Sequence, residues 1–153
     1  MTGPEAFAGR WDRLEAAYFD RIAEVTAPFE RWRDRFRAGA QETARLVEAH
    51  PAEACFLAVD SLSAGELGQA CRRRFASRLT ARLDSARAEL PDPELVPEAT
   101  GGWIVAFFFA RVHRRCTQPE GPDLPSQVPE LLFLAVSAYF GTVAGLEELL
   151  SPP

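Results

Sequence analysis

The sequence has 153 residues, of which 47% are hydrophobic and 25% are charged, a composition typical of one globular domain. A chain of this size buries about 68–70% of its unfolded surface, so its core needs no disulfide or metal for support. The net charge of -5 argues against a nucleic-acid-binding protein, because affinity for phosphate backbones comes largely from clustered positive charge.

The first half of the chain predicts three helices. Apolar residues at spacings of three and four predict an amphipathic helix over about residues 4–25. Its stripe is formed by Phe7, Trp11, Leu14, Tyr18, Ile22 and Val25. A second helix is expected to hold Pro28 in its first turn and to end before Pro51. A short apolar segment, EACFLAV, then runs into DSLSAG, whose small and turn-forming residues indicate a corner.

Three more helices are predicted in the second half. A long helix is expected over about residues 65–90, closed by the three prolines of LPDPELVP. A helix over about 97–117 and a final helix over about 127–149 flank the loop TQPEGPDLPSQVP. The pattern shows no strand-like alternation and no internal repeat. We therefore expect an all-α fold of about six helices in a single domain over residues 4–150.

Two apolar stretches are too short to span a membrane. An unbroken apolar run extends from Trp103 to Ala110 and ends at Arg111, and LLFLAVSAYFGTVAGL occupies residues 131–146. A membrane-spanning helix needs about 20 predominantly apolar residues. We expect both stretches to be buried in protein and predict no membrane partner.

No catalytic or metal-binding motif occurs in the sequence. The glycines form neither GxGxxG nor a phosphate loop, the serines form no GxSxG, and the histidines belong to no HExxH. His50 precedes Pro51, which favours a capping role at a helix end, and His113 lies among arginines, which favours a rim or interface position. We expect no enzyme, no metal and no cofactor.

The cysteines and the N-terminus indicate a cytoplasmic protein. Cys55, Cys71 and Cys116 form an odd set without CxxC spacing, so buried, reduced thiols are expected rather than a disulfide framework. The N-terminal residues lack the basic and apolar regions of a signal peptide.

Three arginines recur at every fourth position of the predicted 65–90 helix. Arg74, Arg78 and Arg82 predict a solvated basic face, with an anion-binding site as the alternative.

Large aromatic side chains lie on several of the predicted inward stripes. A helical domain with so many rings can pack solidly or enclose an apolar cavity, and the sequence leaves both possibilities open. Candidate ligand-binding residues are the inward positions of the central helices, namely Trp32, Phe36, Phe56, Phe75, Leu79, Trp103 and Phe107.

The predicted final helix carries a stripe of small residues. Small side chains let two helix axes approach closely, and a second copy that offers the same last two helices would bury their apolar surface in a four-helix bundle. The alternative is that these helices pack only on the preceding ones. The candidate dimer-interface residues are Ile104, Phe108, Leu131, Ala135, Ala138, Thr142 and Gly145.

Several strings resemble the regulatory domain of TetR/AcrR-type transcriptional regulators. VPELLFLAVSAYFG at 128–141 resembles the end of that domain, and GPEAFAGRWDRLEAAYFDRIAEV resembles the helix that follows the DNA-binding headpiece. LVEAHPAEACFLAVDSLSAG resembles the family's short connecting helix. The resemblance covers about Pro4 to Leu150. It implies a homodimeric, ligand-binding domain whose central helices enclose a small apolar or amphipathic effector.

Regulators of this family carry a helix-turn-helix headpiece, which would precede Pro4, where this sequence has three residues. We therefore expect no direct nucleic-acid contact from this chain alone. An upstream start, a domain of a longer protein and a headless relative all stay open as explanations. In the first two, the family implies that an effector shifts the 4–25 helix and changes the spacing of two DNA-reading heads. Two competing classes are a helical enzyme for apolar substrates and an interaction bundle with a solid core.

Overall fold

The computed structural model describes residues 3–151, and this part of the chain is helical throughout, without a β-strand. Its α-helices are α1 (Gly3–Thr26), α2 (Trp32–Ala49), α3 (Pro51–Ala58), α4 (Gly65–Asp84), α5 (Thr100–Thr117), α6 (Val128–Phe140) and α7 (Thr142–Leu150). Short 3₁₀ segments lie in the connections, at Asp60–Ser63, Ser85–Glu89, Pro93–Leu95 and Pro125–Gln127. The predicted all-α class is confirmed, with seven α-helices in the described part of the chain.

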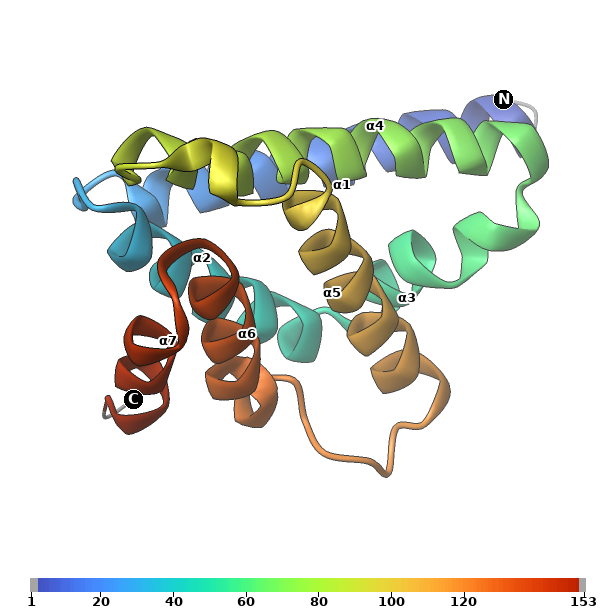
Figure 1. Cartoon of the computed structure of the whole chain (residues 1–153). Helices are drawn as coiled ribbons and strands as arrows, with labels where there is room; N and C mark the ends of the chain where they lie inside the picture. The colour runs from blue at the N-terminus through green and yellow to red at the C-terminus, as the bar shows by residue number, and fades with distance from the viewer. Residues whose placement is uncertain (1–2, 152–153) are drawn as a thin grey trace.

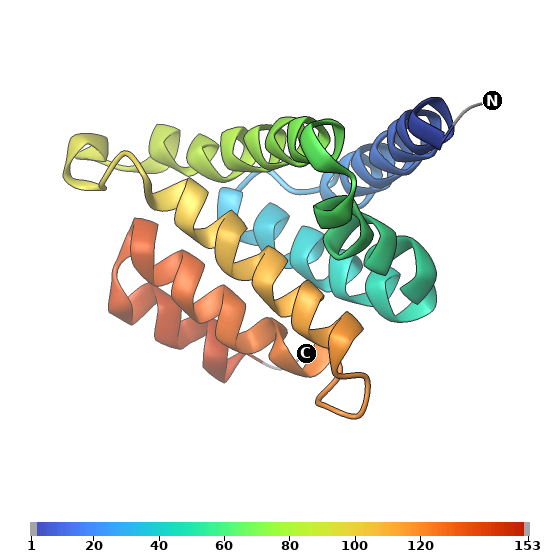
Figure 2. The ribbon, with the colours of Figure 1, turned by 90° about the vertical axis from the view of Figure 1, so that its right-hand side faces the viewer.

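The helices form layers around a central region. Helices α1 and α4 lie side by side and run in the same direction along one edge of the molecule (Figure 1). Helix α2 lies against α1, and α5 crosses the molecule between α4 and the C-terminal helices (Figure 2). Helices α6 and α7 form an antiparallel hairpin, and α6 packs on α2 and α5. Four helices, α1, α2, α4 and α5, therefore surround the middle of the domain.

The core is divided into separate clusters rather than forming one continuous block. An aromatic cluster joins α1, α3 and α4, where Trp11 is fully buried. Its buried members are Trp11, Phe19, Phe56, Cys71 and Phe75. A second cluster surrounds Trp32 and Tyr139, and a third joins α2, α3, α5 and α6 through small and aliphatic side chains such as Ala44. Spaces between these clusters form the cavities described below.

The predicted final helix over 127–149 is wrong, because the chain reverses at Gly141. Gly141 has φ of 93° and ψ of 164°, in a region that only glycine adopts readily. A Cβ on Gly145 would lie 1.9 Å from Ser137 Oγ and 2.8 Å from the carbonyl oxygen of Phe133. The absence of a side chain at Gly145 therefore lets α7 pack directly on α6 within one chain.

Two other helix boundaries differ from the prediction. The α-helix expected over 65–90 ends at Asp84 and continues as a 3₁₀ segment, and Pro28 lies in the connection before α2 rather than in its first turn. The start of α2 is determined by a residue far away in the sequence, because the backbone N–H of Trp32 donates to the carboxylate of Glu89 at 2.7 Å. This contact joins residues far apart in the sequence, so local patterns could not place it.

Helix α7 is held on α2 by a buried charge. Glu148 is 3% exposed, and its carboxylate accepts hydrogen bonds from Arg33 and Arg37 at 2.8–3.0 Å. Burial by itself would raise the pKa of Glu148, but the hydrogen bonds from the two arginines outweigh it and lower that pKa. The ionised carboxylate of Glu148 and the two arginines therefore attach the hairpin to α2.

Candidate functional site

Two apolar cavities lie among the central helices. Cavity I has a volume of about 410 Å³, is partly open to solvent and is lined by side chains of α1, α2, α4, α5 and α6. Cavity II has a volume of about 340 Å³, is also partly open and is lined by side chains of α1, α2, α3, α4 and α5. Both fall at the lower end of the range of roughly 300–1,000 Å³ that small-molecule sites occupy.

Cavity I contains three of the predicted ligand-binding residues. Trp32 and Phe36 stack on α2 with ring centroids 4.8 Å apart, and Leu79 faces them from α4. Trp32 is 2% exposed, and its Nε1 donates to the backbone carbonyl of Arg82 at 3.4 Å. This bond joins the start of α2 to the end of α4, next to the part of cavity I that the two rings line.

Cavity II contains one predicted residue, Phe75, and its apolar lining combines aliphatic and aromatic side chains. Its polar lining comes from Arg21, His50 and Glu53, together with the hydroxyls of Tyr18 and Thr43. The predicted capping role of His50 applies to its backbone, whose N–H donates to the carbonyl of Leu46 at the end of α2.

The two cavities share a boundary. Tyr18, Thr43 and Phe108 line both of them. The hydroxyls of Tyr18 and Thr43 lie 3.0 Å apart, and Thr43 donates its own hydrogen to the carbonyl of Gly39 at 2.7 Å, so Tyr18 is the donor between them. Burial raises the pKa of Tyr18, which keeps the phenol protonated for this role.

Three predicted ligand-binding residues lie elsewhere. Phe56 belongs to the solid aromatic cluster, where its ring centroid lies 5.0 Å from that of Phe7. Trp103 is 64% exposed on the outer side of α5. Phe107 lines neither cavity and packs toward Ala40 and Leu131 under the guanidinium of Arg111.

Helix α5 presents a different face inward from the one that we predicted. Ile104 and Phe108, assigned to a dimer interface, line cavity I together with Leu131. The helix is apolar on nearly every side, so periodicity could not determine its orientation.

The other candidate interface residues divide between interior and surface. Ala135 is fully buried, and Gly145 is enclosed in the hairpin. Ala138 and Thr142 are exposed. The structure therefore separates this predicted stripe into an inner part and an outer part.

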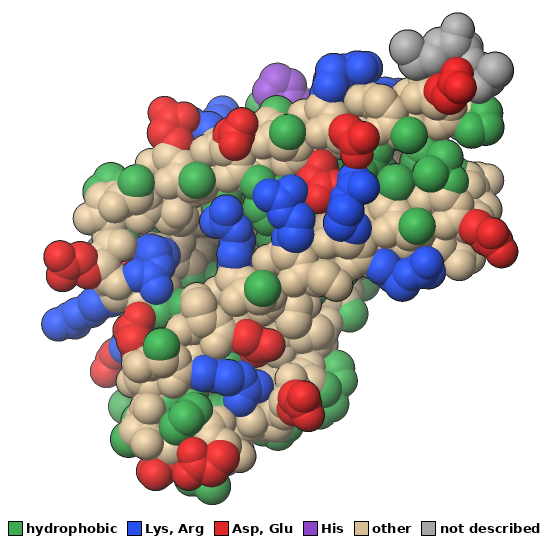
Figure 3. Space-filling model, turned by 90° about the horizontal axis from the view of Figure 1, so that it is seen from above, with side chains coloured by type: hydrophobic (Ala, Val, Ile, Leu, Met, Phe, Trp, Pro, Cys, Tyr) green, Lys and Arg blue, Asp and Glu red, His purple; other side chains and the backbone are tan. Residues whose placement is uncertain are grey.

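The seam between α1 and α4 is charged. Glu15 is 3% exposed and accepts hydrogen bonds from Arg74 Nη2 at 2.7 Å, Arg78 Nη1 at 3.0 Å and Trp11 Nε1 at 2.8 Å. Burial would raise the pKa of Glu15, but these hydrogen bonds outweigh it and lower that pKa. Figure 3 shows basic and acidic side chains meeting along this line. The side chains of Arg74 and Arg78 are 51% and 48% exposed, in agreement with the predicted solvated basic face, but both also bind Glu15 on another helix.

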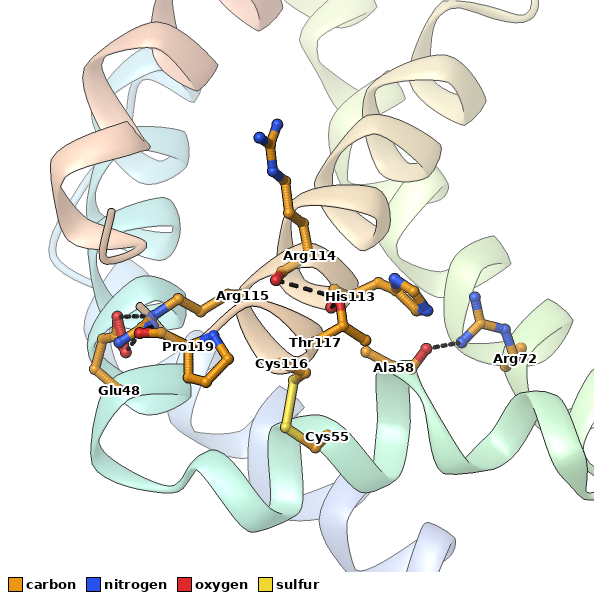
Figure 4. Close-up of a disulfide and its surroundings, with 10 residues drawn as sticks. All are labelled: Glu48, Cys55, Ala58, Arg72, His113, Arg114, Arg115, Cys116, Thr117 and Pro119. Carbon is orange, nitrogen blue, oxygen red and sulfur yellow. Dashed lines mark hydrogen bonds and ion pairs between the residues drawn. A yellow bond between two sulfur atoms is a disulfide. The ribbon is translucent and has the colours of Figure 1, made fainter. Parts of the chain in front are cut away.

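A disulfide joins α3 to the end of α5. Cys55 and Cys116 are bonded (Figure 4), which corrects the expectation of three reduced thiols. Cys71 is free and buried, as predicted. The cysteines are 61 positions apart and no spacing rule connects them. Cys55 directly follows Ala54, which lines cavity II, so the disulfide holds the part of α3 that lines this cavity.

No metal site and no membrane span are found within residues 3–151. No group of three or more His, Cys, Asp or Glu side chains there could hold a metal ion. No helix in this range is long and apolar enough to cross a bilayer.

Comparisons with known proteins identify no relative of this chain. No family model, curated protein or solved structure matches it. A functional assignment therefore depends on the cavities and on the sequence resemblance.

Proposed function

We propose that this chain is an effector-sensing and dimerisation domain similar to that of TetR/AcrR-type regulators, which binds a small apolar or amphipathic molecule. The observation that carries the proposal is the pair of adjoining apolar cavities between α1, α2, α4 and α5. An interaction bundle with a solid core would not need such spaces. We propose sensing rather than catalysis, so a bound molecule should be recovered unchanged.

Helix α1 is suited to report occupancy. It lines both cavities through Tyr18, and it is attached to α4 by Glu15 through directional, charge-assisted hydrogen bonds. In a regulator of this type, α1 would follow the DNA-binding headpiece. A ligand that displaces Tyr18 would change the position of α1, and the headpiece would move with it.

We propose that two copies associate through the outer side of the hairpin and α5. The exposed large apolar side chains of these helices are Trp103, Leu134, Val143, Leu146, Leu149 and Leu150. Ala138 and Thr142, on the exposed part of the predicted stripe, lie on the same hairpin. Burial of exposed apolar area drives association. Light scattering should give the dimer mass for the native chain and the monomer mass for Leu146→Arg.

As a regulator of this type, the protein would work in the cytoplasm. Disulfides are uncommon in that compartment, so Cys55 and Cys116 would be exposed there to reduction.

Binding to the cavities is tested with a neutral apolar fluorophore, N-phenyl-1-naphthylamine. Gly39 lines cavity I, and a Cβ there would meet only Thr26 and Ile22 at 3.7 and 3.8 Å, so Gly39→Phe should fill the cavity. We expect the native chain to bind the fluorophore and Gly39→Phe to lose most of that binding. Gly102→Phe is the matched control, because Gly102 lines neither cavity and a Cβ there meets nothing within 4 Å. Equal binding by both variants would contradict the proposal.

A further inference from the structure

The rim of cavity I is cationic although the chain as a whole is acidic. The charged residues that line it are Arg35 and Arg82, and its lining also includes Thr26 and Ser85. No carboxylate lines this cavity among the described residues. Since the net charge of the chain is -5, an anion would be repelled on average and could be held only by a local group of this kind.

Arg82 has no carboxylate partner within residues 3–151. Arg78 and Arg74, one and two turns earlier on α4, both bind Glu15. Arg82, the third arginine of this row, forms no ion pair with Glu15. Its guanidinium lies 5.2 Å from the ring centroid of Phe19. It is exposed, so its donors face solvent at the end of α4. A guanidinium with free donors is suited to bidentate binding of a carboxylate.

Arg35 lines the same cavity from α2. It donates to the backbone carbonyl of Glu30, and its Nη2 lies 3.7 Å from Glu89 Oε2, a long contact for an ion pair. Its charge is therefore only partly neutralised. The two arginines therefore come from two different helices, α2 and α4, that both line cavity I.

Behind this rim the cavity is apolar. Its lining continues through Ile22, Leu79, Leu83, Ile104 and Val105. The polar pair Tyr18 and Thr43 lies at the boundary with cavity II. The charge of Arg82 also acts on this inner end, since it lowers the pKa of Tyr18 against the larger, raising effect of burial. A cation at the opening of an apolar cavity matches a ligand with an anionic head and an apolar tail.

We infer that cavity I selects amphipathic monocarboxylates, with the carboxylate at Arg82 and Arg35 and an apolar tail directed toward Tyr18. This inference rests on the proposed function and narrows its effector class. The net charge of the chain would disfavour an anion without this rim, so the head group rather than the tail should decide which ligand binds.

The test compares three ten-carbon probes that differ only in the head group: decanoate, 1-decanol and decylammonium. Each probe is titrated against the native chain, Arg82→Gln and Arg73→Gln, by displacement of N-phenyl-1-naphthylamine. Arg73 is the matched control, because it is an exposed arginine on α4 that lines neither cavity I nor cavity II. Circular dichroism of the variants confirms that they are folded.

We expect decanoate to bind the native chain and Arg73→Gln about tenfold more tightly than 1-decanol does. The reason is that one charge-assisted hydrogen bond lowers a dissociation constant by a factor of about ten. Arg82→Gln should remove that advantage and leave 1-decanol binding unchanged. Equal affinities of decanoate and 1-decanol for the native chain, or tighter binding of decylammonium, would overturn the inference while supporting the cavity as an apolar site. An equal loss in Arg73→Gln would overturn it too. Failure of all three probes and of the fluorophore would contradict the proposed function itself.

Discussion

The hydroxyls of Tyr18 and Thr43 form a hydrogen bond of 3.0 Å from α1 to α2 at the boundary between two apolar cavities. Because both side chains line both cavities, a molecule in either one contacts the same pair. The bond therefore links the occupancy of the cavities to the position of α1, the helix that we propose as the moving element.

Tyr18→Phe should weaken this boundary. The variant keeps the ring contacts with Phe19 and Phe75 but loses the hydrogen bond to Thr43, so the free energy of unfolding should fall by about 1 kcal/mol. A ring without that bond can move aside, which joins the two cavities. We expect the affinity for hexadecanoate to rise relative to decanoate, measured by displacement of N-phenyl-1-naphthylamine.

Tyr139→Phe is the control for this prediction. Tyr139 donates to Asp84 at 2.7 Å, so its variant also loses a hydrogen bond, but Tyr139 lines neither cavity. Its stability should decrease while the ratio of the two affinities stays unchanged. A shift of that ratio in both variants would argue against a boundary role for Tyr18.

Gly145→Ala should destabilise the hairpin of α6 and α7. The added Cβ would lie 1.9 Å from Ser137 Oγ and 2.8 Å from the backbone oxygen of Phe133, and a backbone atom cannot rotate away. Overpacking of this kind costs about 1–3 kcal/mol. Urea denaturation should show the loss.

Gly102→Ala serves as the opposite case. Gly102 lies within α5, and a Cβ there meets nothing within 4 Å. Alanine is favoured over glycine in a helix by up to about 1 kcal/mol, so this variant should be more stable than the native chain. Similar losses from both glycine substitutions would show that close packing at Gly145 is not the cause.

The sequence predicted the helices well where one face was clearly polar. The stripe of Trp11, Tyr18 and Ile22 placed α1 almost to the residue, because an amphipathic pattern gives both the period and the buried side. In α5 the pattern gave the helix but not its orientation. Trp103 and Phe108 are equally apolar, and only the packing of the other helices decides that the first is exposed and the second lines a cavity.

Contacts between distant segments account for most of what the sequence left open. Gly141 is a single residue in an uncharged stretch, and a glycine there is compatible with a continuous helix as well as with a reversal. The partners of Glu15 are on α4, and the partner of Cys55 is 61 positions away. None of these pairings follows from local spacing, so a single sequence could not predict them.

The free energy of unfolding should decrease in acid as Glu42 becomes protonated. Hydrogen bonds from Arg45 and then from Arg21 lower the pKa of this carboxyl from 4.5 to about 2, against the raising effect of burial. A pKa lower in the folded than in the unfolded chain stabilises the fold above the unfolded value, and that contribution disappears as the pH falls from 4.5 toward 2. Glu42→Gln should lower the free energy of unfolding at neutral pH by on the order of 2 kcal/mol.

Glu24→Gln is the comparison for Glu42→Gln. Glu24 is 70% exposed and also pairs with Arg21, at 3.1 Å, but an exposed pair contributes little. Urea denaturation at several pH values should show a flatter acid limb for Glu42→Gln and an unchanged one for Glu24→Gln. An unaltered acid limb in Glu42→Gln would contradict the assignment.

Loss of the disulfide should have the largest effect on stability. The bond between Cys55 and Cys116 closes a loop over a separation of 61 residues, for which chain entropy gives about 4 kcal/mol. The double variant Cys55→Ser, Cys116→Ser should lose a large part of this, and dithiothreitol should destabilise the native chain similarly without affecting the variant. Thiol titration of the unfolded, unreduced protein should find Cys71 alone.

The disulfide should also affect ligand binding. Since Cys55 follows Ala54, which lines cavity II, the double variant should bind N-phenyl-1-naphthylamine with a different affinity from the native chain. Unchanged stability together with unchanged binding would show that the bond neither supports the fold nor shapes that cavity.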